Sequence, residues 1–288
     1  MKIATNWQDY EIIATGNGEK LERWKDVYLL RPDPQIIWKN ENDLHKYPLL
    51  NAHYHRSNAG GGKWSNIKRT PEEWTVNYKQ LTFSIKMMGF KHTGLFPEQA
   101  ANWDIMMDLI KNANRPIKVL NLFAYTGGAT VACASAGASV THVDCVKQIV
   151  ERAKLNIQLS GLKDAPVRYI VDDCKKFIER EIRRGRKYDA VIMDPPSYGR
   201  GPTGEVWKIE ENIDDFVSLT SQILSDKPLF FLLNSYTTGL SASTMKYITD
   251  SRLLTKWHGK SEADELGLPV KESGLCLPCG SSVRVTFE

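Results

Sequence analysis

The sequence has no long apolar stretch and few cysteines. No segment approaches the ~20 consecutive apolar residues of a membrane-spanning helix, and the first ten residues lack the apolar core of a signal peptide. The five cysteines are odd in number and scattered, which is not the pattern of a disulfide framework. Free thiols are typical of a reducing compartment. We therefore expect a cytoplasmic protein with no membrane partner.

The chain also lacks a strong net charge. Its 38 basic and 34 acidic residues leave a formal charge of +4. This balance permits a nucleic-acid partner without indicating one, because local clustering of cations matters more than their total. The segment 53–64 combines cations, aromatic rings and glycines, a mixture typical of phosphate contact and base stacking. Packing or capping roles for His53 and His55 are the alternative.

The composition and residue pattern of the sequence change near residue 90. Before it, aromatic residues and turn signals are dense, which predicts a small β-rich N-terminal region over residues 1–88. Two of its expected strands are 24–30 and 35–38. After residue 115, strand and helix patterns alternate, which predicts βαβ units, a parallel sheet and an α/β fold over residues 89–288.

A glycine-containing loop follows the first strand of the expected sheet. Its sequence, Tyr125-Thr126-Gly127-Gly128, has neither the Gly-x-Gly-x-x-Gly pattern nor the Gly-Lys-Ser/Thr ending of a Walker A loop. Glycine lets a backbone approach a ligand closely, and the helix start that follows offers unpaired N–H groups. The loop therefore favours a ligand without a pyrophosphate, with an ordinary strand-to-helix turn as the alternative.

Acidic residues close the next two expected strands. Asp144 comes 16 residues after Gly128, which places it at the end of the second strand of a βαβ unit. An acid there can bind ribose hydroxyls, although an NAD enzyme has the same acid and helix capping is an alternative. One βαβ step later, Asp173, with Asp172 as its rival, is expected to bind an adenine amino group, and capping is again the alternative.

The fourth strand ends in Asp194-Pro195-Pro196-Ser197-Tyr198. Two prolines fix the backbone and have no N–H, so we expect the neighbouring carbonyls to point outward as acceptors. Asp194 and these carbonyls would bind a base edge, and Tyr198 would stack on an extruded base. A rigid turn is the alternative. The segment 200–204, directly afterwards, is expected to be a substrate loop.

Together these motifs resemble those of class I S-adenosylmethionine (SAM) dependent methyltransferases. The specific resemblance, over about residues 89–288, is to the large-subunit ribosomal RNA methyltransferases that modify cytosine C5 or guanine N7. It implies a Rossmann-like seven-stranded sheet, SAM as cofactor and a nucleic-acid base, in ribosomal RNA, as acceptor. The residues implied in cofactor binding are Phe96, Gln99, Phe123, Tyr125, Thr126, Gly127, Gly128, Asp144, Asp172 and Asp173. Those implied in catalysis are Asp194, Pro195, Pro196 and Tyr198.

The chain departs from this family in three places. Glu98 and Ala100 stand where the family has Asp and Arg, and its N-terminal RNA-binding domain is not recognisable in residues 1–88. The segment after the fifth strand, 233–237, contains no cysteine. Because methylation at C5 needs a covalent nucleophile, a nitrogen target is favoured.

Other readings of the sequence stay open. A protein or small-molecule acceptor, a non-catalytic SAM- or RNA-binding protein, and an NAD-dependent oxidoreductase are the alternative functions. Cys276 and Cys279 form a single Cys-x-x-Cys pair, whereas a structural zinc site needs two more ligands. We expect this pair in a loop before a final strand over 283–287, and we expect no metal site.

Overall fold

The computed structural model describes residues 1–57, 61–200 and 206–288. The chain divides into two compact units. Unit 1 consists of Met1–Ala101 and Gly267–Cys279, and unit 2 of Asn102–Leu266 and Gly280–Glu288. Among the described residues, no helix has the length and hydropathy to cross a membrane. Residues 58–60 and 201–204, parts of two expected binding segments, lie outside the described residues.

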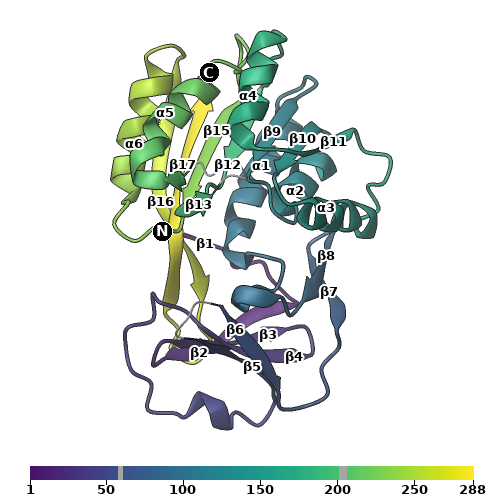
Figure 1. Cartoon of the computed structure of the whole chain (residues 1–288), viewed down its shortest axis with the longest axis vertical. Coiled ribbons are helices and arrows are strands. Elements are labelled where there is room, and N and C mark those ends of the chain that lie inside the picture. Colours follow the sequence, from purple (N-terminus) through teal and green to yellow (C-terminus); the bar gives the residue numbers. More distant parts are fainter. Residues whose placement is uncertain (58–60, 201–205) are drawn as a thin grey trace. The chain divides into compact units, whose positions relative to one another are not determined.

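Unit 1 confirms the expected β-rich N-terminal region (Figure 1). Its main sheet has the order β2-β3-β4-β5-β6, in which β4 and β5 are parallel and the other neighbours antiparallel. The strands are β2 (Tyr10–Gly16), β3 (Glu19–Trp24), β4 (Val27–Pro32), β5 (Leu50–Arg56) and β6 (Gly62–Asn66), and a separate hairpin joins β7 (Glu73–Tyr78) to β8 (Leu81–Lys86). The described part of the unit also contains three short 3₁₀ helices: η1 (Leu44–Lys46), η2 (Gly89–Lys91) and η3 (Pro97–Gln99).

The expected strand over 24–30 is confirmed only from Val27, where β4 begins. The chain turns after Trp24, so that Trp24 ends β3 and pairs with Val27 at the start of β4. Lys25 has a φ of 59°, the left-handed conformation that a tight hairpin turn requires. Apolar residues stand on both sides of this turn, so their spacing alone did not show it. The segment 35–38 is not a strand.

A buried ion pair joins the first three strands of the main sheet of unit 1, β2, β3 and β4. Glu22 on β3 is fully buried, and its two carboxylate oxygens accept hydrogen bonds from Arg31 on β4 at 2.6 and 2.8 Å. The hydroxyl of Tyr10 on β2 donates to the same carboxylate at 2.7 Å. Burial alone would raise the pKa of Glu22, but the positive charges of Arg31 and Lys20 hold it below the ordinary value.

Unit 2 alternates strands and helices as expected (Figure 1). Three of its elements, α1, β16 and β17, have one end in the ranges of unit 1. In chain order the elements are α1 (Ala100–Asn112), β9 (Lys118–Leu122), α2 (Gly128–Ser135), β10 (Ser139–Asp144), α3 (Lys147–Leu159), β11 (Val167–Val171), α4 (Cys174–Arg183), β12 (Ala190–Met193), β13 (Tyr198–Arg200), β14 (Val206–Lys208), α5 (Ile209–Ser221), β15 (Phe230–Ser235), α6 (Ala242–Thr249), η4 (Asp250–Leu254), β16 (Gly259–Pro269) and β17 (Cys276–Phe287).

The sheet order confirms the Rossmann-like fold. It runs β16-β17-β15-β12-β9-β10-β11, with the two-residue β1 (Lys2–Ile3) as an eighth strand beside β16. The strands from β15 to β11 are parallel, and β17 is antiparallel to β15. Strand order reverses between the neighbours β9 and β12, and ligands of open α/β sheets bind at such a switch point.

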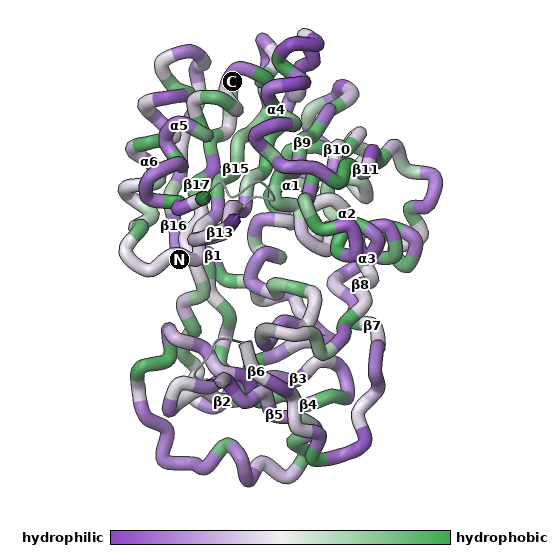
Figure 2. The backbone as a smooth tube through the Cα atoms, in the orientation of Figure 1, coloured by the Kyte–Doolittle hydropathy of each residue, from purple (hydrophilic) through white to green (hydrophobic). Residues whose placement is uncertain are grey.

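The central strands are buried on both faces. Every residue of β12 and β15 is buried, and both strands are hydrophobic along most of their length (Figure 2). Val143 packs into the core with α4, α5 and α6, whereas its neighbour His142 is hydrogen-bonded to Thr130 of α2. Successive side chains of a strand point to opposite faces, so α4–α6 and α2 cover opposite faces of the sheet.

The expected loop at Cys276–Cys279 is also wrong. Both cysteines lie in β17, which begins at Cys276 and runs to Phe287. The reason is its neighbour β16, an eleven-residue strand that gives the early part of β17 a pairing partner. Pairing with the strand that directly precedes it in the chain thus overrode the local turn signals in the sequence.

The buried ion pair yields a stability prediction. Replacing Glu22 by Gln leaves Arg31 without its counter-charge, and breaking a buried pair in this way costs about 3 kcal/mol of unfolding free energy. The same change at Glu72, which is 86% exposed and pairs with Lys86, should have little effect. Urea unfolding of both variants measures the difference.

The pH dependence of the same variant supplies a second check. The folded-state pKa of Glu22 is lowered, so its stabilising effect is complete above the unfolded-state pKa of about 4.3. The effect is lost as pH falls through the folded value. Glu22→Gln should lack this part of the acid sensitivity, and an unchanged acid profile would show that Glu22 does not contribute as an anion.

Candidate functional site

The pairing register brings the expected site motifs to one edge of the sheet. Leu122, the last residue of β9, pairs with Val143 of β10 and with Met193 of β12. The residues that follow these three positions, Phe123, Asp144 and Asp194, therefore stand at the same level at the carboxyl edge of the sheet. Val171 pairs with Asp144, so Asp172 follows one step beyond. The carboxyl ends of four parallel strands thus carry the four motifs.

The loop after β9 has an unusual backbone. Phe123 (φ 54°) and Tyr125 (φ 49°) are in the left-handed region although neither is glycine, and Gly127 follows at φ 82°. Such conformations cost about 1–2 kcal/mol for a residue with a side chain and persist where surrounding contacts hold them. Here Ala124 N–H donates to the Val143 carbonyl (3.1 Å). Tyr125 N–H donates to Asp144 Oδ2 (2.9 Å).

The two glycines of this loop are required by the protein's own packing. A Cβ on Gly127 would lie 2.9 Å from the Cβ of Ala153 on α3, and one on Gly128 would lie 2.7 Å from Trp103 on α1. The side-chain amide of Asn156 also donates to the Thr126 carbonyl at 2.8 Å. These glycines let two helices approach the loop, and close approach to a ligand stays a prediction.

Asp144 is half-buried at the end of β10 and already accepts hydrogen bonds from its own protein. Besides Tyr125 N–H, its carboxylate accepts the N–H of Val146 at 3.0 Å, so it closes the turn before α3. Burial raises the pKa of Asp144, and the bonds from backbone N–H groups only partly oppose this effect. Each carboxylate oxygen has a second lone pair, which leaves capacity for a hydroxyl donor.

The acids after β11 have divided roles. Asp173 is the N-cap of α4, and its Oδ1 accepts the N–H of Lys176 at 2.9 Å. Asp172 accepts the N–H of Asp173 at 2.8 Å and forms an ion pair with Arg180. The capping alternative therefore holds for Asp173, while adenine binding by either acid stays a prediction.

The turn after β12 is hydrogen-bonded to Trp207, a residue that the sequence motifs did not indicate. The carbonyl of Pro196 accepts the indole N–H of Trp207 at 2.6 Å, so it already has one partner within the protein. The expectation that carbonyls of this turn bind a ligand stays a prediction. The Ser197 carbonyl accepts the N–H of Ile209 at 3.1 Å, and Thr237 donates its hydroxyl to Ser197 Oγ at 2.6 Å. Tyr198 is left 51% exposed.

Trp207 belongs to an aromatic cluster that sequence reasoning missed. Its ring centroid lies 5.8 Å from that of Phe123 and 5.4 Å from that of Phe216 on α5, and these two phenylalanines are 5.5 Å apart. The cluster joins the loop after β9 to the β13–β14 hairpin and α5. Phe123, expected at the cofactor, packs at least in part on its own protein. No local motif marks Trp207.

A buried polar chain ties β9 and β10 to α2 on the other face of the sheet. Asn121 donates to Thr130 Oγ1 at 2.9 Å, and Thr130 Oγ1 is hydrogen-bonded to His142 Nδ1 at 2.9 Å. Burial lowers the pKa of His142 to about 3, so the ring is neutral. This chain sets the position of α2, and therefore of Gly128 at its start.

Phe96 and Gln99, the other expected cofactor residues, lie in unit 1 around η3. Gln99 is 8% exposed and Phe96 is half-buried, with its ring centroid 5.9 Å from that of His92. Burial lowers the pKa of His92 to about 4, and the charges of Arg31 and Lys91 add to this effect. The neutral His92 thus packs beside Phe96, whose role in binding the cofactor stays a prediction.

Comparisons with known proteins agree with this geometry. A family model described as S-adenosylmethionine-dependent methyltransferase matches residues 38–209, more than half of the chain. The crystal structure of a SAM-dependent methyltransferase from Agrobacterium tumefaciens is 34% identical, with a TM-score of 0.91 over 99% of this chain and 92% of that one.

Two curated relatives share the name "Ribosomal RNA large subunit methyltransferase K/L". That of Shewanella frigidimarina is 30% identical over 58% of this chain and 23% of its own length. That of Syntrophotalea carbinolica is 25% identical over 63% of this chain and 25% of its own length. The chain therefore spans about a quarter of the curated relatives it matches.

The packing around Gly127 generates a prediction for this loop. Gly127→Ala should destabilise the protein through both its positive φ and the contact with Ala153. Gly137→Ala is the matched control, because Gly137 has a φ of 95° and open space where a Cβ would be. Gly137→Ala should lower the unfolding free energy only by the cost of a left-handed backbone, about 1–2 kcal/mol. Gly127→Ala should lower it by more.

A double-mutant cycle isolates the contact. Ala153→Gly by itself should cost about 1 kcal/mol of helix propensity, but it should recover part of the loss in the Gly127→Ala background. Unfolding free energies of the two single variants and the double variant measure this coupling. Simple additivity would show that the Ala153 contact does not require the glycine.

Proposed function

Because the chain belongs to the S-adenosylmethionine-dependent methyltransferase family, we propose that it transfers the methyl group of SAM to a nitrogen of a base in ribosomal RNA. The observation that carries the proposal is the register at the switch point. It sets Asp144, at the end of β10, and Asp194, at the end of β12, level with each other on either side of β9. The names of the curated relatives support the RNA acceptor. Ribosomal RNA as acceptor would place the reaction in the cytoplasm.

Residues of the first three strand ends form the proposed cofactor site. We assign the ribose hydroxyls to Asp144 and the methionine part to the loop from Tyr125 to Gly128. Asp173 uses Oδ1 as a helix cap, and we assign its second oxygen to the adenine amino group. SAM supplies an electrophilic methyl group on a sulfonium centre. The protein's contribution is to hold the acceptor nitrogen in line with that methyl.

The turn after β12 forms the proposed acceptor site. Pro195 is buried and fixes the backbone, and Asp194 is half-buried beside it. Tyr198 exposes half of its surface, and the guanidinium carbon of Arg200 lies 5.9 Å from the centre of its ring. An exposed ring beside a cation suits base stacking with a phosphate nearby. Asp194 would accept a hydrogen bond from the base edge.

The surroundings of β15 support a nitrogen target. Ser235 ends this strand, where a nucleophile for C5 chemistry would be expected. It is 2% exposed, and its hydroxyl oxygen accepts the N–H of Thr237 at 3.1 Å. A buried serine that caps its own turn is not an activated nucleophile. Direct transfer to nitrogen needs no covalent intermediate.

The cofactor assignment predicts the effect of Asp144→Asn. Loss of a charged acceptor costs about 1.5–3 kcal/mol of binding free energy, so calorimetry should show S-adenosylhomocysteine binding about 10- to 100-fold more weakly. Glu151→Gln on the exposed face of α3 is the matched control and should bind normally. Equal affinity in Asp144→Asn would remove this residue from the site.

The acceptor assignment predicts the effect of Asp194→Ala. The wild-type protein, methyl-labelled SAM and deproteinised ribosomal RNA should give an N-methylated nucleoside, identified by mass spectrometry. Asp194→Ala should reduce the rate at least about 100-fold while it still binds S-adenosylhomocysteine. Tyr198→Phe should keep more activity than Tyr198→Ala, because it keeps the stacking ring.

Other outcomes of this assay contradict defined parts of the proposal. C5-methylcytosine would overturn the nitrogen target. Label in protein or small molecules instead of RNA would show that the acceptor is not a nucleic-acid base. A planar amide of a protein or small molecule also fits an Asp-Pro-Pro-aromatic turn. Cofactor binding without turnover on any acceptor would indicate a binding protein.

A further inference from the structure

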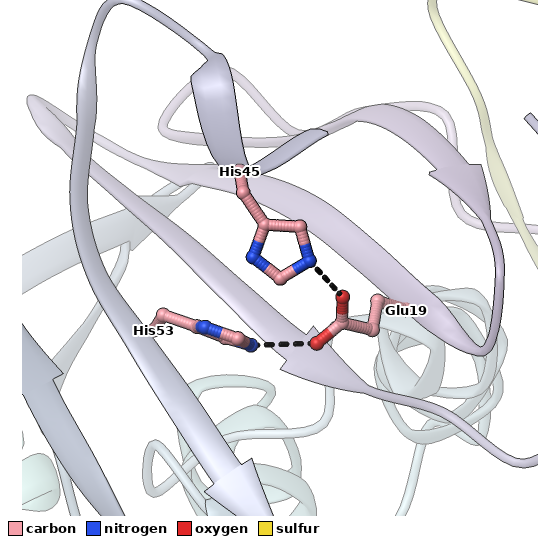
Figure 3. Close-up of side chains that lie close together, drawn as sticks. All are labelled: Glu19, His45 and His53. Atoms are coloured by element: carbon pink, nitrogen blue, oxygen red, sulfur yellow. Dashed lines mark hydrogen bonds and ion pairs between the residues drawn. The ribbon is translucent and has the colours of Figure 1, made fainter. Parts of the chain in front are cut away.

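Three of the six histidines of the chain gather at one place in unit 1. The ring centroid of His53 lies 4.7 Å from that of His45 and 4.0 Å from that of His55. The carboxylate of Glu19 lies between His45 and His53, as Figure 3 shows. Neither the methyltransferase fold nor the proposed reaction uses this cluster.

The β-sheet explains how Glu19 and His53 meet. Glu19 begins β3 and pairs with Pro32 of β4, while His53 on β5 pairs with Leu30 on the other side of β4. Leu30 and Pro32 are two residues apart, so residues paired with them point to the same face of the sheet. His45 comes from η1, within the connection between β4 and β5, and completes the group from above that face.

The distances within the group approach those of a metal site. His53 Nε2 is 2.6 Å from Glu19 Oε1, and His45 Nε2 is 3.1 Å from Glu19 Oε2. One ligand atom from each of the three residues lies within 4.8 Å of the others. Ligands about 2.0–2.2 Å from a tetrahedral zinc ion are about 3.4 Å apart. Movements of about 1 Å would therefore enclose an ion.

The chemistry of the group also fits a cation. His53 is 8% exposed, and burial lowers its pKa although Glu19 opposes the shift. A neutral imidazole has the lone pair that a metal needs. A divalent ion would accept such a lone pair from each of two imidazoles and bind the carboxylate as well.

We propose that Glu19, His45 and His53 form a binding site for one divalent transition-metal ion of the Zn²⁺ type, with solvent as the fourth ligand. Two imidazoles and one carboxylate are a ligand set that zinc accepts. The side chain of His45 is 54% exposed and provides the route of entry. The ion would tie the β4–β5 connection, through η1, to the sheet of unit 1.

Cobalt binding to the full-length protein tests the site directly. The protein is first treated with a chelator, and Co²⁺ is then titrated while visible absorption is recorded, because four-coordinate Co²⁺ has strong d–d bands. We expect saturation at one equivalent per chain, displacement of Co²⁺ by Zn²⁺, and a melting temperature that rises with Zn²⁺ concentration.

Variants identify the ligands. His45→Ala changes an exposed residue and should fold normally, yet it should lower the affinity for Co²⁺ at least 10-fold, as should Glu19→Gln. His258→Ala, at a histidine of unit 2, is the matched control and should bind as the wild type does. His53→Ala serves only if circular dichroism shows a folded protein.

Two results would overturn the site. The first is wild-type protein that takes up no Co²⁺ or Zn²⁺, which would make the group a carboxylate hydrogen-bonded to two imidazoles. The second is His45→Ala and Glu19→Gln that bind metal as tightly as the wild type. Methyl transfer plays no part in these readouts, so the metal site and the proposed function are tested separately.

Discussion

The candidate site depends above all on the in-register pairing of the buried parallel strands β10, β9 and β12. Leu122 pairs with both Val143 and Met193, so three chain segments leave the sheet at one level. Strands buried on both faces tolerate no slippage, because a shift of one residue would move every side chain to the opposite face. The alignment of Asp144 and Asp194 is thus a consequence of the core.

The residues at this edge bond to their own protein before any ligand is considered. Asp144 closes the turn before α3, Asp173 caps α4, and the Pro196 carbonyl accepts the indole N–H of Trp207. Gly127 and Gly128 admit Ala153 and Trp103. These contacts hold a backbone with left-handed Phe123 and Tyr125 in one conformation. Preorganisation of this kind means that a ligand meets groups already oriented, which lowers the entropic cost of binding.

Two glutamates of unit 1, Glu22 and Glu19, have different surroundings. Glu22 and Arg31 are enclosed with their partners and satisfy each other inside the sheet. Glu19, three residues earlier on the same strand, instead lies between two imidazoles at a partly exposed face. The first arrangement is complete, since Tyr10 and Lys20 also contact Glu22. The second has donor atoms spaced for a cation, and this difference separates a structural ion pair from a candidate metal site.

The sequence by itself determined the alternating order of strands and helices after residue 115 and the positions of the strand-end motifs. An apolar run followed by an acid or glycine is a local pattern, and alternation of strands and helices over about 30 residues specifies a parallel sheet. Tertiary structure decided which partners those residues have. Backbone geometry or contact with another segment decided four features: the turn at Lys25, the extension of β17 through Cys276 and Cys279, the bond from Trp207 and the meeting of His45 with Glu19. Spacing within one segment carries no record of such partners, because they are selected only when the whole core packs.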